Sequence, residues 1–302
     1  MAGKKPGPVL VTGANSGIGL AAVLHLAQRG WEVHGTVRSE AKAEALRAAA
    51  RDARVAARVH PLVLDVSDHA AVVAAWPALP EFYAVVNNAG YSETGPIEEV
   101  SAERARAQLD VNLIAPAVIA SCALPAMRRR GAGRIVMVSS IAGRAVVMPL
   151  NGWYHASKFA LEALSDVLRV EVASFGVKVV LVEPGFFKTG IGDCTRERTS
   201  AASGHASSPY ARAYARVEAG LELVERFAPP PGAVARAITN AIESTRPRAR
   251  TLVGVDALAT AATVPWIPRE LTDFTMRLAG GLLGAARSAP QSAAKRGPTR
   301  RA

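Results

Sequence analysis

The chain has 302 residues, half of them hydrophobic but only 5% aromatic, which is enough apolar material for one large α/β domain with a core of alanine, valine and leucine. The two cysteines, Cys122 and Cys194, are far apart, which argues against a disulfide framework or a cysteine-based metal site and fits a reducing, cytoplasmic compartment. The net charge is +11, but there is no basic stripe with interleaved aromatics, no signal peptide and no uncharged apolar run of ~20 residues, so nucleic-acid binding, secretion and membrane spanning are not expected.

Apolar runs alternate with helical patterns along the chain. The runs predict strands at 8–13, 31–37, 59–66, 83–90, 134–140, 177–185 and, as an added edge strand, 250–254. Helical patterns include one that ends at Gly30 and others at about 40–52, 68–76, 101–130, 153–175, 210–227, 233–244 and, in pieces, 256–287. Because the strands are nearly continuous apolar runs, both faces of the sheet should be covered. The pattern predicts a doubly wound parallel sheet in a three-layer α/β/α arrangement, with a C-terminal helical extension.

Polar motifs follow the strands at their carboxyl ends, where ligands bind in this architecture. The first motif, TGANSGIG, carries Gly13, Gly17 and Gly19 between a strand and a helix. Glycine allows positive φ there and lets a phosphate approach the backbone N–H groups at the helix N-terminus. The spacing G-x3-G-x-G differs from G-x-G-x-x-G, so the position after the first strand is what favours a dinucleotide site.

Arg38 follows the second strand, at the point where an acidic residue would hold a ribose 2′-hydroxyl and an arginine would hold a 2′-phosphate. The local sequence GTVRS contains no acid. The sequence therefore predicts a preference for NADP(H) over NAD(H), and a solvated loop charge is the alternative interpretation of Arg38.

Tyr154 and Lys158 are four residues apart at the start of a predicted helix and therefore share a face of it. A free tyrosine has a pKa near ~10, and a nearby ammonium, reinforced by an oxidised nicotinamide, favours the phenolate and lowers that pKa. A lower pKa would make Tyr154 a useful proton donor or acceptor. Ser140, at the end of the fifth strand, would hold the oxygen that exchanges the proton, and Ser139 is the alternative for that role.

Five features, TGANSGIG, NNAG, Ser140, YHASK and EPG, occur in the order typical of the single-domain branch of the short-chain dehydrogenase/reductase family, which the chain resembles from about residue 8 to 190. The stretch RPRARTLVGVDALA resembles the C-terminal region of members related to retinol and 17β-hydroxysteroid dehydrogenases. The resemblance implies a Rossmann fold and hydride transfer between NADP(H) and a carbonyl or alcohol carbon. A non-catalytic NADP(H)-sensing protein on the same fold is the alternative.

The resemblance also implies roles for individual residues. Tyr154 would be the general acid/base with Lys158 beside it, and Ser140 would bind the substrate oxygen. Asn112 would complete a proton relay with Lys158 through water or, alternatively, only fill or bridge a polar space. No metal is expected, and the cofactor would be held by Gly13, Asn15, Ser16, Gly17, Ile18, Gly19, Arg38, Asp65, Val66, Asn87, Tyr154, Lys158, Phe187 and Thr189. The separation of Ser140 and Tyr154 is one residue longer than the family commonly shows, so the loop between them should bulge.

Residues 1–302 are expected to form one domain, with a dinucleotide-binding and catalytic core at 8–190, a substrate lid at 190–230, a C-terminal extension at 256–287 and a disordered basic tail at 288–302. The expected substrate is an apolar carbonyl or alcohol compound of retinoid, steroid or lipid type. The apolar stretches at 258–267 and 276–286 could line the pocket, pack in an oligomer or touch a membrane surface. By analogy with the family, the helices at 101–130 and 153–175 would pair in a homodimer or homotetramer.

Overall fold

The computed structural model of the chain describes residues 5–188 and 208–283. Thr189, Cys194, the part of the expected lid before residue 208 and the basic tail at 288–302 lie outside the described residues. Within the described ranges, seven parallel strands form one sheet in the order β3-β2-β1-β4-β5-β6-β7. The chain changes direction across the sheet between β1 and β4, and a crevice for ligands forms at the carboxyl ends of strands around such a switch point.

All seven predicted strands are present, and helices connect them. The strands are β1 (Val9–Val11), β2 (Val33–Val37), β3 (Val59–Val63), β4 (Ala84–Asn87), β5 (Gly133–Val138), β6 (Val177–Pro184) and β7 (Arg250–Val253). The α-helices are α1 (Gly17–Gln28), α2 (Glu40–Asp52), α3 (His69–Ala75), α4 (Ala102–Leu109), α5 (Ala115–Arg130), α6 (Gly152–Glu171), α8 (Ala211–Phe227), α9 (Gly232–Glu243), α10 (Val255–Thr263) and α11 (Arg269–Ala279).

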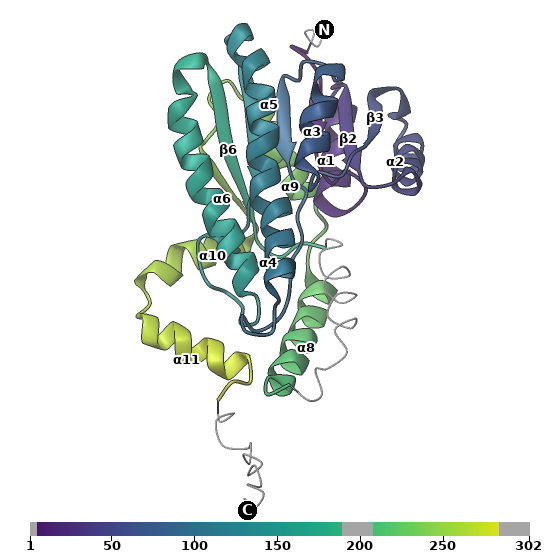
Figure 1. The fold of residues 1–302 in the computed structure, drawn as a ribbon. Helices are drawn as coiled ribbons and strands as arrows, with labels where there is room; N and C mark the ends of the chain where they lie inside the picture. Colours follow the sequence, from purple (N-terminus) through teal and green to yellow (C-terminus); the bar gives the residue numbers. More distant parts are fainter. Residues whose placement is uncertain (1–4, 189–207, 284–302) are drawn as a thin grey trace, which may run out of the picture.

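The sheet is the middle of three layers, as predicted (Figure 1). Alternate residues of a strand point to opposite faces, and β5 shows the result. Val136 and Val138 belong to the core shared with α1, α2 and α9, whereas Ile135 and Met137 belong to the core shared with α3, α5 and α6. Because each face buries its own row of aliphatic side chains, the strands read as continuous apolar runs in the sequence.

The helix predicted at 101–130 is interrupted by a π-helical segment, Asp110–Ile114, between α4 and α5. Pro116 has no N–H to donate to the carbonyl of Asn112 four residues earlier, which loosens the α-helical pattern at this point. The whole stretch Ala102–Arg130 is long and apolar enough to cross a membrane by composition. Here, however, Ile119 and Met127 pack into the core on one side of the sheet, so one face of this stretch is buried within the fold.

The third strand is shorter than predicted and ends at Val63. The Asp65 carboxylate accepts hydrogen bonds from the backbone N–H of Ser67, at 3.0 Å, and from its hydroxyl, at 2.8 Å. This local side-chain bonding forms a turn in place of further strand pairing.

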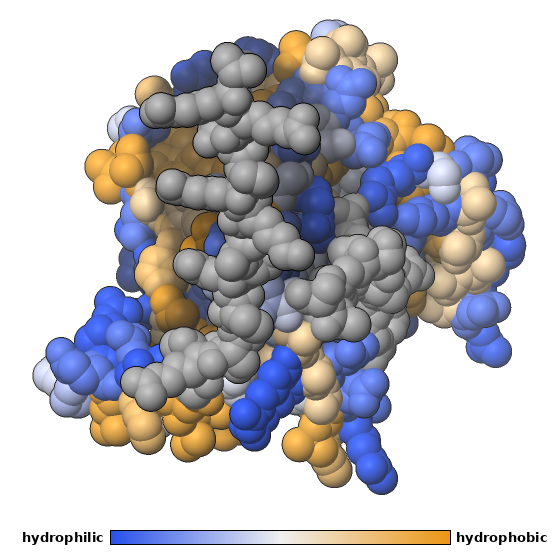
Figure 2. All heavy atoms as spheres, turned by 60° about the horizontal axis from the view of Figure 1, so that its bottom comes forward, coloured by the Kyte–Doolittle hydropathy of each residue, from blue (hydrophilic) through white to orange (hydrophobic). Residues whose placement is uncertain are grey.

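Helices α8, α10 and α11 lie beyond the carboxyl ends of the strands (Figure 1). Tyr214 of α8 packs with Leu150 and donates its hydroxyl to Glu99 at 2.9 Å, which fastens α8 to the sheet domain. Helix α11 has no buried residue, and Phe274 is among its exposed apolar side chains. Figure 2 shows apolar side chains gathered along the edge that this segment forms.

Candidate functional site

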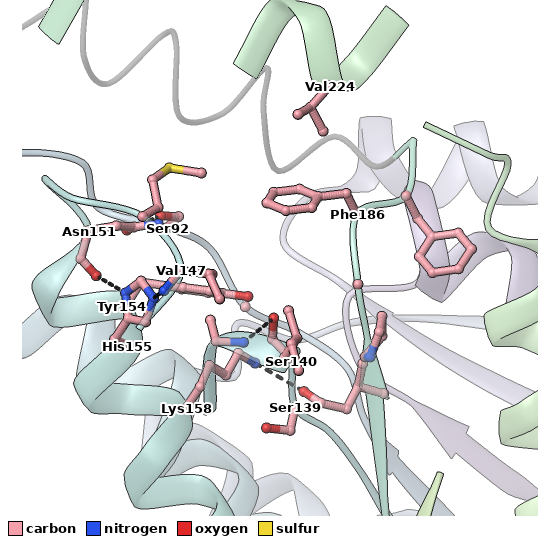
Figure 3. A pocket seen from close by; sticks show the side chains of 18 of the residues that line it. Ser92, Ser139, Ser140, Val147, Asn151, Tyr154, His155, Lys158, Phe186 and Val224 are labelled. Carbon is pink, nitrogen blue, oxygen red and sulfur yellow. Dashed lines mark hydrogen bonds between the residues drawn. The ribbon is translucent and has the colours of Figure 1, made fainter. Parts of the chain in front are cut away.

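One pocket at the carboxyl ends of the strands brings together most of the predicted site. Its lining includes Ile18 from the first turn of α1, the side chains of Ser140, Tyr154 and Lys158, and Val224 from α8. Figure 3 shows Tyr154 and Lys158 reaching from α6 toward the end of β5, with Val224 on the opposite side of the opening. The turn after β1 and the polar side chains after β5 therefore face one space.

The turn between β1 and α1 has the geometry of an anion-binding cradle. Gly13 and Gly17 have φ of +65° and +53°, values that favour glycine. A Cβ atom on Gly19 would lie 2.1 Å from the Gly13 carbonyl oxygen, so only glycine allows this close backbone approach. Ser16 makes no side-chain cap to α1, and the first turn of the helix has no acidic residue. The first N–H groups of α1 are thus suited to a phosphate, and the turn fits a dinucleotide.

A Gly19→Ala substitution is expected to destabilise the fold by about 1–3 kcal/mol, because the new Cβ must displace backbone of the same turn. Urea unfolding followed by circular dichroism measures this change. Gly220→Ala is the matched control, since Gly220 lies in α8 with no atom within 4 Å of a new Cβ, and we expect it to be neutral or stabilising. Equal unfolding midpoints for the two variants would contradict the close approach at Gly19.

Asn87, the last residue of β4, and Asn88, the residue after it, point to different places, and it is not the predicted one that lines the pocket. Asn87 was expected to line the cofactor cleft, but its side chain is buried beneath the sheet and donates to the Met137 sulfur at 3.3 Å. Asn88 lines the pocket instead, and its amide donates to the Thr12 carbonyl at 2.9 Å and to the Gly13 carbonyl at 3.3 Å. The alternation of side chains along a strand decides which of the two reaches the site.

Arg38 follows β2 at the same edge of the sheet and is exposed to solvent. Within the described part of the chain its guanidinium forms no ion pair or side-chain hydrogen bond, so it is available to a phosphate. Asp65 lies after β3 on the same edge, and its carboxylate is bound to Ser67. Val66 is buried in the core beside α3 and α5 rather than exposed to the edge.

Ser140 and Tyr154 meet in the pocket. In Figure 3 the Tyr154 ring extends toward the Ser140 hydroxyl. The Ser140 oxygen is fixed because it accepts the Ala142 N–H at 3.1 Å. Burial raises the pKa of Tyr154, and the hydrogen bond with Ser140 opposes that rise. The Ser139 hydroxyl points away from the phenol in Figure 3, so the structure places Ser140, not Ser139, next to Tyr154.

Lys158 is buried one helical turn beyond Tyr154. Its Nζ donates to the Val138 carbonyl at 3.0 Å and lies 5.7 Å from the centre of the Tyr154 ring. Burial lowers the pKa of Lys158 to about 8, and the Glu162 carboxylate opposes that change. The expectation that the protein's own lysine brings the pKa of Tyr154 below its usual value is wrong, because desolvation of the buried phenol is the largest effect on that pKa and raises it.

Asn112 lies in the π-helical segment with its side chain fully engaged. Its Oδ1 accepts the Tyr91 N–H at 3.0 Å, and its Nδ2 donates to the Tyr91 carbonyl at 2.9 Å and the Ser157 hydroxyl at 3.0 Å. A Cβ on Gly90 would lie 3.1 Å from Asn112 Oδ1 and 3.7 Å from Lys158 Nζ, so the two side chains border the same glycine. The amide bridges backbone, as the alternative interpretation held, and its part in a proton relay stays a prediction.

The loop between Ser140 and Tyr154 is braced by His155. Its Nε2 accepts the Val147 N–H at 3.0 Å, and its Nδ1 donates to the Asn151 carbonyl at 2.8 Å. Burial lowers the pKa of His155, which favours this neutral form. His155 therefore supports the pocket wall and is not directed at the reacting atoms.

Phe187, predicted at the nicotinamide end of the cleft, lines the pocket together with Phe186. A residue that the sequence analysis missed holds this segment: Asp256 Oδ2 accepts the Phe186 N–H at 2.6 Å. A Cβ on Gly185 would lie 2.1 Å from the same carboxylate. The two segments are 70 residues apart in the chain, and only the pairing of β6 with β7 could reveal the contact.

The family model for short chain dehydrogenases matches residues 8–200. The chain is 31% identical over 277 residues to an NADPH-dependent 3-dehydrocapnine reductase of Ornithobacterium rhinotracheale, which covers 87% of the chain and 94% of the relative. It is 30% identical over 279 residues to a 3-ketodihydrosphingosine reductase of Bacteroides thetaiotaomicron, and this match covers 91% of the chain and 98% of the relative. It is 32% identical over 283 residues to the human 17-beta-hydroxysteroid dehydrogenase type 6, covering 89% and 87%.

Solved structures agree with this match. A short-chain dehydrogenase from Streptomyces avermitilis superposes with a TM-score of 0.70 at 28% identity, over 90% of the chain and 97% of that structure. A metagenomic short-chain oxidoreductase in complex with NADP superposes with a TM-score of 0.63 at 25% identity, over 82% of the chain and 97% of that structure.

Proposed function

Because the chain belongs to the short-chain dehydrogenase family, we propose that it transfers a hydride between NADP(H) and the carbonyl or alcohol carbon of an apolar substrate, with Tyr154 as the general acid/base. The observation that carries this proposal is the meeting of the Tyr154 phenol, the Ser140 hydroxyl and the Lys158 amine in a pocket that also includes Ile18 of the glycine turn. One space thus combines a proton donor and an oxygen-binding hydroxyl, and Ile18 in its wall belongs to the helix that begins at the anion cradle.

The proton step uses the chain's own groups. Burial keeps the Tyr154 phenol protonated at neutral pH, so it is a donor to a substrate oxygen in the reducing direction. Ser140, fixed by Ala142, would hold the same oxygen at hydrogen-bonding distance. The Lys158 ammonium next to the ring would stabilise the phenolate that is left after proton transfer.

The cofactor fits the edge of the sheet that runs from β3 to β1. Bound NADP(H) would supply or accept the hydride at the substrate carbon. The turn Gly13–Gly19 would hold its diphosphate, Asp65 and the backbone of Val66 would contact the adenine, and Arg38 would pair with the 2′-phosphate. The NADP(H) preference is supported by Arg38, which is exposed and has no ion-pair partner among residues 5–188 and 208–283, and by the NADPH-dependent relative.

The proposed substrate is an apolar ketone or alcohol of lipid, steroid or retinoid type. The outer part of the pocket is mostly apolar, with Met148, Phe186, Leu221 and Val224 in its lining. Relatives of the chain carry names that refer to sphingoid, capnine and steroid ketones, which agrees with such a wall. Apolar walls around one polar group are typical of sites that bind hydrophobic ligands.

The proposal is tested by turnover. Purified protein is incubated with NADPH and a panel of long-chain 3-ketones, steroid ketones, retinal and small aldehydes, and oxidation of NADPH is followed by absorbance. We expect reduction of at least one apolar carbonyl compound and slower reduction of the small aldehydes. Tight NADPH binding with neither reduction of any carbonyl compound nor oxidation of any matching alcohol would favour the alternative of a non-catalytic sensor. No feature of the described pocket supports that alternative.

An exposed apolar face on α6 supports the proposed homodimer or homotetramer. Phe159, Val167 and Val170 of α6 are exposed, and Ile114 is exposed next to α5. Val170 retains 74% of its accessible surface. Side chains of this kind are commonly covered by a second copy of the chain, and a twofold pairing through α5 and α6 would cover them.

A second apolar face, on the C-terminal segment, supports weak contact of a cytoplasmic protein with an anionic membrane. Leu258, Trp266, Leu271, Phe274 and Leu278 are exposed there, and residues 287–302 add five cations and no acid. Exposed tryptophan and aliphatic side chains next to cations are typical of helices that lie in the lipid headgroup region.

A Trp266→Asp/Phe274→Asp double substitution is expected to weaken binding to phosphatidylglycerol vesicles by about tenfold or more, since it removes two apolar anchors and adds two negative charges. Vesicle sedimentation measures the bound fraction. Val73→Asp on α3 is the control, because Val73 is also exposed but lies on another element. If all three proteins, wild type included, bind these vesicles equally, the face is not a membrane contact.

A further inference from the structure

Tyr154 and Lys158 are the first two members of a longer row on α6. Glu162 and Asp166 follow at the same interval of four residues, so the four side chains lie along one stripe of the helix. Lys158 and Glu162 are both almost completely buried, whereas the Asp166 side chain is 40% exposed. A buried carboxylate next to a buried lysine is costly unless each has a partner of opposite charge.

The Glu162 carboxylate is held by residues from outside α6. Arg250, the first residue of β7, donates to Glu162 Oε2, to Glu183 Oε1 at 2.9 Å and to Asp166 Oδ2 at 2.5 Å. Glu183 of β6 is fully buried, and its other oxygen accepts from Arg144 at 3.1 Å. One guanidinium thus ties the Glu162 side chain to the sheet directly behind the proposed active site.

The charged and polar groups near Lys158 and Glu162 come from every element packed against this part of α6. They are Val138 and Ser139 at the end of β5, Arg144 after the short helix Ile141–Gly143, Asn112 in the π-helical segment, Glu183 on β6, Arg250 on β7, and Tyr154 and Asp166 on α6 itself. Burial raises the pKa of Glu162, the hydrogen bond with Ser139 lowers it, the nearby Glu183 raises it and Arg250 lowers it. In its ionised form, Glu162 is the carboxylate that raises the pKa of Lys158 against the effect of burial.

From this arrangement we propose that Glu162, anchored by Arg250, is a positioning residue that keeps Lys158 in its ammonium form and thereby sets the upper pH limit of the reaction. The proposal rests on the proposed function for its consequence in catalysis, but not for the state of the lysine. Without the carboxylate, a buried amine would lose its proton more readily, and the phenolate of Tyr154 would lose its counter-charge. The Arg250 guanidinium cannot serve as the counter-charge of the Tyr154 phenolate in place of Lys158, because it is already paired with Glu162, Asp166 and Glu183.

The test compares Glu162→Gln, which keeps the shape and removes the charge, with Glu162→Asp, which keeps the charge and loses a methylene. Competitive acetylation of the protein without cofactor, over pH 6–10, gives the titration midpoint of Lys158 from the mass spectrum of its peptide. We expect a wild-type midpoint of about 8, a midpoint lower by roughly one unit in Glu162→Gln, and a wild-type value in Glu162→Asp. Asp166→Asn is the matched control, since Asp166 also binds Arg250 but lies one turn farther from the lysine.

The pH profile of NADPH-dependent turnover is the second readout. Activity that needs the ammonium is present below the Lys158 midpoint and is lost above it, so Glu162→Gln should retain activity near pH 6 and lose about tenfold relative to wild type near pH 9.

A purely structural role of Glu162 predicts the opposite order, with the isosteric Gln tolerated better than the shorter Asp. That order, an unshifted midpoint in Glu162→Gln, or a wild-type midpoint below 7 would overturn the proposal. If Glu162→Gln does not fold, the wild-type midpoint and the Glu162→Asp profile decide alone. Lack of turnover with the expected midpoints would instead contradict the proposed function.

Discussion

Tyr154→Phe is expected to lower kcat for carbonyl reduction by about 10³-fold, with NADPH affinity and folding unchanged. The substitution removes only the hydroxyl, and the aromatic ring still fills its place between Ser140 and Lys158. Without the phenol, the Ser140 hydroxyl is too weak an acid to donate the proton, and the Lys158 ammonium is engaged by the Val138 carbonyl. Steady-state kinetics of NADPH oxidation, together with fluorescence titration of NADPH, measures both quantities.

The direction of the pKa shift adds a pH test to this prediction. Because burial raises the pKa of Tyr154, the wild-type phenol is protonated at neutral pH, and reduction should be efficient there. Oxidation of an alcohol needs the phenolate, so its rate should rise with pH in wild type, up to the pH at which Lys158 loses its proton, and lose that rise in Tyr154→Phe. Tyr210→Phe serves as the control, because Tyr210 is also a hydrogen-bonded tyrosine but lies just before α8, outside the pocket lining. Undiminished turnover of Tyr154→Phe would end the proposed mechanism.

Arg38→Asp is expected to change the ratio of NADPH to NADH affinities by about 10²–10³-fold in favour of NADH. The guanidinium has no protein partner in the described chain, so its charge is available to a 2′-phosphate in a strong, charge-assisted pair. Removing one partner of such a pair and adding repulsion costs about 2–5 kcal/mol. An aspartate at the end of β2 is also able to accept a hydrogen bond from the ribose 2′-hydroxyl of NADH.

The measurement is the dissociation constant of each cofactor at constant ionic strength, because exposed charges are screened by salt. Arg58→Asp is the matched control: it makes the same charge change just before β3, at the opposite edge of the sheet from the ligand site. We expect the control to keep the wild-type ratio. If Arg38→Asp also keeps it, Arg38 is only a solvated loop charge, and the cofactor preference must come from other residues.

The sequence was sufficient for the architecture because the core leaves a strong pattern. Valine-rich runs of the length of a strand, each followed by an amphipathic stretch, predicted all seven strands and the layers around them. Element ends were less well predicted where a single side chain decides them. Pro116 lies in the first turn of α5 after a π-helical segment, and the Asp65 carboxylate forms a turn after β3 in place of the three further strand residues that were predicted.

The sequence predicted those parts of the candidate site that depend on the spacing of residues within a single element. Tyr154 and Lys158 share a face of α6 whatever the rest of the chain does, and the glycines after β1 announce a close backbone approach. Asn88 was overlooked in favour of Asn87 because the choice depends on which way β4 is turned against the sheet. The pKa of Tyr154 was predicted in the wrong direction because burial cannot be read from neighbours in the sequence.

By itself, the sequence determined a parallel α/β sheet, a phosphate cradle after its first strand and a tyrosine–lysine pair on one helix, since all of these are local patterns with a fixed geometric meaning. Only the tertiary structure decided which groups surround that pair. The packing of β6 and β7 brings Glu183, Arg250 and Asp256 to within bonding distance of the active-site wall from as many as 88 residues away. Contacts of this range depend on how the layers assemble, and they set the burial and charge that the chemistry of the site requires.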